Sequence, residues 1–126
     1  VICLISALAF HDITTQIPRV VDLAIPAHRH PPKIDYPPIQ PYWFSGKAYS
    51  SGIEVHEIDG VQVRIYSPAK TVADCFKYRN KIGLDVALEA LRNCRQRRLC
   101  SNDELWQYAK ICRVSKVMKP YLEALS

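Results

Sequence analysis

Apolar and polar residues alternate along two neighbouring segments in the middle of the chain, Ile53–Ile58 and Val61–Tyr66. A period of two is typical of β-strands, in which successive side chains point to opposite faces. Asp59-Gly60 separates the two segments, and such a pair accepts the positive φ angles of a tight turn. The pattern therefore predicts a β-hairpin, and we expect one of its two sides to be buried.

After Tyr66 the apolar spacing changes to the period of a helix. Ser67 is a suitable N-cap and Pro68 a suitable first helical residue, because both reduce the number of unpaired amide groups at a helix start. We expect this helix to end at Gly83, with a second helix following it at once.

Two more helices are expected before the end of the chain. Ser101 and Glu104 have the spacing of a capping box, which predicts a helix start. The last helix is expected within Ser115–Leu125, where Pro120 must lie near the start or cause a kink.

The first half of the chain has shorter patterns. Val1–His11 is apolar on every side, which predicts a helix that is either buried or packed against a neighbour missing from this chain. Strands are expected at Val20–Ile25 and Ile39–Phe44, the second at a sheet edge because it contains Pro41. Together the patterns predict an α+β fold in one domain, residues 1–126, with a small, mainly antiparallel sheet and a C-terminal cluster of about four helices.

The composition is that of an ordinary globular protein. Of the 126 residues, 48% are hydrophobic and 23% are charged, which excludes a disordered chain. The five cysteines contain no CxxC pair, and the four histidines do not complete a zinc site, so we expect neither a metal nor another cofactor. Scattered cysteines in odd number are typical of free thiols in a reducing cytoplasm, where we expect the protein to act.

Positive charge is concentrated in the second half of the chain. Up to Tyr66 the net charge is −1, and from Ser67 onward it is +6, which gives the total of +5. A basic surface favours an acidic partner, most often nucleic acid, although lysine and arginine also solvate exposed helices. The candidate nucleic-acid-binding residues are Lys77, Lys81, Arg92, Arg95, Arg97, Arg98, Lys110, Arg113, Lys116 and Lys119.

Three polar residues, Lys70, Thr71 and Asp74, lie close together at the start of the helix that follows the hairpin. A phosphate site is one interpretation, since free amides at a helix start attract anions, but a nucleotide loop needs glycines that this turn lacks. The other interpretation is structural. Thr71 can bond back to an earlier carbonyl, and Asp74 lies four residues after Lys70, so their side chains can pair. We favour anchoring of the helix to the strand.

Enzymatic function is the competing hypothesis. A metal-dependent nuclease of the restriction type would need an aspartate at a strand end and a Glu-x-Lys sequence on the next strand. Asp22, Glu54 and Asp74 could supply carboxylates, but His56 stands where the lysine should follow Glu54. We therefore assign no catalytic or metal-binding residue and expect a protein that is not an enzyme. A divergent nuclease or other metal-dependent enzyme, and a non-catalytic basic interaction module, remain the alternatives.

Several segments carry a resemblance to a known family, in the same order along the chain: "VICLISALAFHDITTQIP", "VDLAIP", the hairpin, "YSPAKTVADCFKYRNKIGLDVALEALR" and "MKPYLEAL". Together they cover nearly the whole chain, and they resemble the C-terminal domain of the AbiEi family of abortive-infection antitoxins. The most specific part of the resemblance is a Ser/Thr-Pro-x-Lys/Arg-Thr-x-x-Asp pattern between sheet and helix. The residues that match this pattern are Ser67, Pro68, Lys70, Thr71 and Asp74.

The resemblance implies the antitoxin of a type IV toxin–antitoxin system that serves in phage defence. Such an antitoxin neutralises a nucleotidyltransferase-like toxin without a stable complex, and it represses its own operon by binding operator DNA through an N-terminal winged-helix domain. This chain begins without methionine, so we expect the winged-helix domain to be missing from it. We expect no membrane partner, because the apolar residues 1–10 are too few to span a bilayer.

Overall fold

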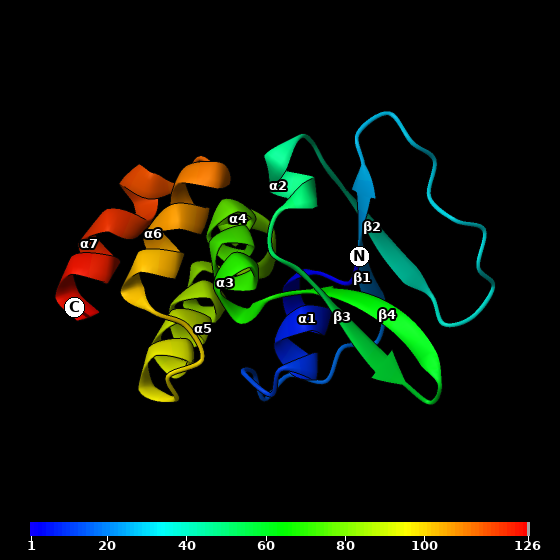
Figure 1. Cartoon of the computed structure of the whole chain (residues 1–126), viewed down its shortest axis with the longest axis horizontal. Coiled ribbons are helices and arrows are strands. Elements are labelled where there is room, and N and C mark those ends of the chain that lie inside the picture. The colour runs from blue at the N-terminus through cyan, green and yellow to red at the C-terminus, as the bar shows by residue number, and fades with distance from the viewer. Residues whose placement is uncertain (126) are drawn as a thin grey trace.

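The predicted hairpin is present in the structure, a computed structural model that describes residues 1–125. Strand β3 (Ile53–Ile58) pairs in antiparallel sense with β4 (Val61–Tyr66) (Figure 1). Asp59 and Gly60 have φ angles of 52° and 80°, as a two-residue turn with two positive φ angles requires.

The expectation of one buried side of the hairpin is wrong. The register places Val55 opposite Arg64, because a two-residue turn pairs odd-numbered with even-numbered positions. The apolar residues of one strand therefore share a face with the polar residues of the other. Val55 is 59% exposed, whereas Ile65 and Tyr66 at the base of the hairpin are buried.

Strands β1 (Val21–Pro26) and β2 (Ile39–Phe44) form a second pair, which is parallel. Ile2 connects the two pairs, since it forms an antiparallel bridge with Leu23 and a parallel bridge with Ile65. The sheet is thus mixed rather than mainly antiparallel. The α+β class is confirmed, and β2 pairs with β1 alone among the strands that the structure describes.

The first helix, α1 (Leu4–Phe10), is shorter than predicted. Residues 1–3 are extended and hydrogen-bond to neighbouring strands, with the Cys3 amide donating to the carbonyl of Asp22 at 3.0 Å. The sequence could not predict this change from extended chain to helix, because a uniformly apolar segment can be buried in either conformation.

Helices account for most of the chain after Tyr66, as predicted. They are α3 (Pro68–Lys77), α4 (Arg79–Ile82), α5 (Leu84–Gln96), α6 (Asn102–Ile111) and α7 (Ser115–Leu125), and one turn, α2 (Lys47–Ser50), precedes the hairpin. The capping box at Ser101 is confirmed. The helix expected to reach Gly83 is interrupted at Tyr78, so α3 and α4 are separate. Within residues 1–125, no helix combines the length and the apolar character that crossing a bilayer requires.

Helix α3 is the centre of the fold. It packs against α1 on the side of the sheet and against α5, α6 and α7 on the other side (Figure 1). Every residue from Ala69 to Phe76 is buried, so the polar face of α3 lies in the interior together with its apolar stripe. The polar residues of the pattern therefore need partners within the protein.

Candidate functional site

The first residues of the Ser-Pro-x-Lys-Thr-x-x-Asp pattern connect β4 to α3. Ser67 is the N-cap of α3, and its hydroxyl accepts a hydrogen bond from the amide of Lys70 at 3.3 Å. The Ser67 amide donates to the carbonyl of Gly52 at 2.7 Å, which attaches the helix start to the turn before β3. Pro68 occupies the first helical position, where no amide is needed.

Thr71 binds the helix to the end of β4. Its hydroxyl donates to the carbonyl of Tyr66 at 3.3 Å, and His11 Nε2 lies 2.8 Å from the same oxygen. Because a carbonyl can only accept, the imidazole must donate through Nε2. The predicted bond from Thr71 to an earlier carbonyl is confirmed, and the acceptor belongs to the strand and is shared with the end of α1.

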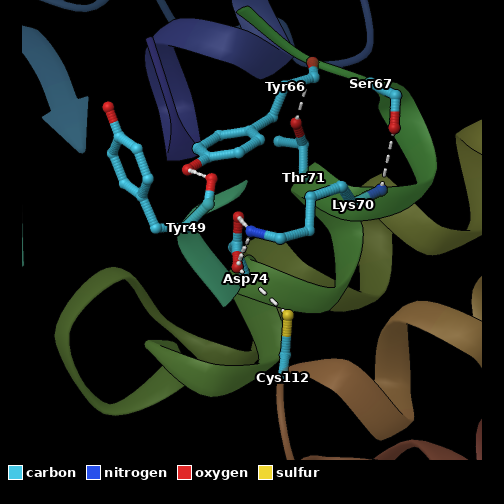
Figure 2. A network of polar contacts seen from close by, with 7 residues as sticks. All are labelled: Tyr49, Tyr66, Ser67, Lys70, Thr71, Asp74 and Cys112. Carbon is cyan, nitrogen blue, oxygen red and sulfur yellow. Dashed lines mark hydrogen bonds and ion pairs between the residues drawn. The ribbon is translucent and has the colours of Figure 1, made fainter. Parts of the chain in front are cut away.

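Lys70 and Asp74 form the predicted pair, and both are in the interior. Lys70 Nζ lies 2.8 and 2.7 Å from the two carboxylate oxygens of Asp74, and the side chains are 0% and 1% exposed (Figure 2). The thiol of Cys112, at the end of α6, donates to Asp74 Oδ1 at 3.4 Å. The pair thus contacts a second helix, which the local spacing could not show.

Two aromatic rings complete the surroundings of the ammonium group. Lys70 Nζ lies 3.9 Å from the ring centroid of Tyr66 and 4.9 Å from that of Phe44, distances at which a cation is attracted to an aromatic face. The hydroxyl of Tyr66 donates to the carbonyl of Tyr49 in α2 (Figure 2). The network therefore links α2, β2, β4, α3 and α6 around one buried ion pair.

Burial determines the protonation of the groups around this network. It raises the pKa of Asp74, an effect that the Lys70 ammonium opposes. Burial, followed by the charge of Asp74, raises the pKa of Cys112 to about 12, so this thiol stays protonated at neutral pH. A protonated thiol and a covered ion pair are poor nucleophiles and bases toward an external substrate. The arrangement can hold helices together, and it offers no surface group for a reaction.

The carboxylates of the nuclease hypothesis also have partners within the fold. Asp22 is buried in β1; burial raises the pKa of its carboxyl group, and hydrogen bonds from the backbone of Ser6 and Ile5 oppose this effect. Glu54 lies 2.8 Å from His56 Nε2 on the hairpin. Within residues 1–125, no three His, Cys, Asp or Glu side chains are grouped closely enough to hold a metal ion. The structure does not assemble Asp22, Glu54 and Asp74 into one site.

The geometry of the pattern residues is thus that of a buried connection between sheet and helix. Searches of protein-family models and of curated proteins find no match to this chain. The resemblance to the antitoxin family therefore rests on the segments quoted above, and the candidate site must be judged by its own chemistry.

Some of the basic candidates come together on the surface next to this network. Lys77 at the end of α3, Lys110 in the last turn of α6 and Arg113 just after it line one hollow of about 420 Å³. Lys47 of α2 lies on the same hollow. Sequence reasoning missed Lys47, because it lies in the acidic half of the chain and no spacing relates it to the other three.

Other basic candidates already have contacts within the protein. Arg95 and Arg97 donate to the carbonyls of Cys100 and Asp12, and Lys81 lies over the Tyr42 ring at 4.6 Å. The remaining four candidates are exposed at positions outside the hollow: Arg92 and Arg98 at the end of α5, and Lys116 and Lys119 on α7. The ten residues therefore do not form one continuous basic face.

Proposed function

We propose that this chain is the C-terminal domain of a type IV antitoxin, which counters a nucleotidyltransferase-like toxin without being an enzyme and without forming a stable complex with the toxin. The observation that carries the proposal is the use of the whole Ser67–Asp74 pattern in the buried connection. The same pattern is the most specific part of the resemblance to the antitoxin family, so its use in one connection between sheet and helix supports the proposal.

In this proposal, repression of the operon belongs to the N-terminal winged-helix domain that the resemblance implies for such antitoxins. Neutralisation of the toxin is the part that this chain can perform. The carboxylates of Asp22, Glu54 and Asp74 all have hydrogen-bond partners within the protein. This is consistent with a role that needs no catalytic carboxylate. A second candidate, the basic interaction module, is favoured by the four cations around the hollow.

Co-expression in bacteria tests the antitoxin role. The toxin in this test is the product of the nucleotidyltransferase-like gene that the proposal expects beside the gene of this protein, induced with or without the chain. We expect growth to be restored by the chain, and no toxin to be retained with it on affinity purification. The Asp74→Ala variant, expected to be strongly destabilised and therefore present at a lower level, serves as the negative control. A folded chain present at high level that leaves the toxin lethal would contradict the proposal.

A further inference from the structure

The hollow next to the buried network collects positive charge from separate parts of the chain. Lys47, Lys77, Lys110 and Arg113 are all exposed, and they come from α2, α3 and the end of α6. The remaining lining consists of Ser45, Gly46, Ala48 and Ile111. The lining thus holds four cations and no acidic side chain.

No side chain within residues 1–125 neutralises these four cations. In the part of the chain that the structure describes, none of the four forms an ion pair. The charge of Lys77 acts on the carboxylate of Asp74, but Lys70 already binds that carboxylate. Lys77 and Lys110 each lie in the last turn of a helix, where positive charge is favourable to the helix dipole. That effect explains two of the four positions, and it does not explain Lys47 or Arg113.

Unneutralised cations that face one concave space raise its potential and attract an anion. The volume of about 420 Å³ lies in the range of small-molecule sites and exceeds what a single small ion would fill. Lysine and arginine are the usual partners of phosphate oxygens. The lining contains no aromatic side chain on which a base could stack, and Ile111 is its largest apolar residue.

We propose that this hollow is a binding site for a polyphosphate group, such as the triphosphate of a nucleotide, recognised through its phosphates and not through its base. A triphosphate carries about as many negative charges at neutral pH as the hollow has cations. This function goes beyond the proposed antitoxin role, and its test involves no toxin. Either proposal can therefore fail without affecting the other.

Isothermal titration calorimetry of the purified chain with inorganic tripolyphosphate and with ATP, in magnesium-free buffer, is the direct test. We expect one site, similar affinity for the two ligands, and weaker binding at physiological than at low salt, because salt screens the attraction between exposed charges. The double variant Lys77→Gln, Arg113→Gln should bind both ligands about tenfold or more weakly than the parent chain, since each charge-assisted hydrogen bond is strong.

The matched control removes two charges outside the hollow, Lys116→Gln with Lys119→Gln on α7. This variant should bind tripolyphosphate as the parent chain does, and thermal melts should show that both variants are folded. Equal weakening by the two variants would overturn the proposal, because the total charge would then be responsible. Binding of ATP without binding of tripolyphosphate would also overturn it, as would no binding of either at low salt.

A duplex DNA arm separates a polyphosphate pocket from a general nucleic-acid surface. DNA should bind more weakly than tripolyphosphate, because a concave site admits a compact anion more readily than a duplex. Tighter binding of DNA, together with a loss in the α7 variant, would replace the pocket by an extended basic surface.

Discussion

Lys70 and Asp74 show how one pair of residues can be costly and still necessary. Both charges are removed from water, and the raised pKa of Asp74 reflects this loss of solvation. Replacing a buried ion pair by apolar side chains of similar size is often neutral, whereas removing one partner leaves an uncompensated charge. The pair therefore contributes more to determining which side chains pack together than to the net stability of the fold.

The residue-scale prediction separates these two effects. Asp74→Ala should lower the free energy of unfolding by about 3–5 kcal/mol, because the Lys70 ammonium keeps its position without a counter-charge. The double variant Lys70→Met, Asp74→Leu should lie within about 2 kcal/mol of the parent chain. Urea unfolding monitored by circular dichroism gives both values. If the double variant were less stable than the single one, the cost of desolvation would have been assigned wrongly.

At the scale of elements, the turn between α2 and β3 must come very close to α3. Gly52 has φ = 77°, and a Cβ placed there would lie 2.7 Å from Cβ and 2.9 Å from Cγ of Lys70. The Gly52 carbonyl also accepts a hydrogen bond from the amide of Ser67. The Lys70 stem is held by its buried ammonium, so it cannot move aside.

Gly52→Ala should therefore destabilise the protein much more than an alanine at Gly60, in the turn between β3 and β4. We expect a loss of about 2–4 kcal/mol from the clash and the positive φ together. Gly60→Ala is the matched control, because φ there is 80° and no atom lies within 4 Å of the new Cβ. Its loss should be about 1 kcal/mol, from backbone strain alone. Equal losses in thermal or urea unfolding would show that the contact with Lys70 is unimportant.

At the scale of the whole molecule, buried thiols make the free energy of unfolding depend on pH in the alkaline range. All five cysteines are free and buried, and burial raises the pKa of Cys75 and Cys112, the latter to about 12. The folded state thus keeps protons that the unfolded state loses above about pH 9, the ordinary thiol pKa. Because the folded pKa is the higher one, this contribution is complete below pH 9 and is lost as the pH rises toward 12.

We expect the free energy of unfolding to fall with pH across this window. Cys112→Ala should reduce the steepness of that fall by about 1.4 kcal/mol per pH unit, the value of one titrating proton. Urea unfolding in reducing buffer at several pH values gives the two slopes. If the free energy of unfolding fell equally steeply with pH in the parent chain and the variant, Cys112 would have the same pKa in the folded and the unfolded state.

The sequence by itself determined those features that depend on neighbours along the chain. The Asp59-Gly60 turn, the Ser67 and Ser101 caps and the pairing of Lys70 with Asp74 follow from backbone preferences and from spacings within one helical turn. The switch from a period of two to a helical period likewise predicted the α+β class.

Tertiary structure alone decided which distant segments meet. Ile2 joins two strand pairs, Cys112 reaches Asp74, and Lys47 comes to lie beside Lys77 at the hollow. The sheet is mixed and the hairpin is exposed at Val55, although the alternating pattern suggested otherwise. Periodicity reports which residues share a face of one element, but burial of that face depends on what packs against it, and contacts between distant segments carry no local signal.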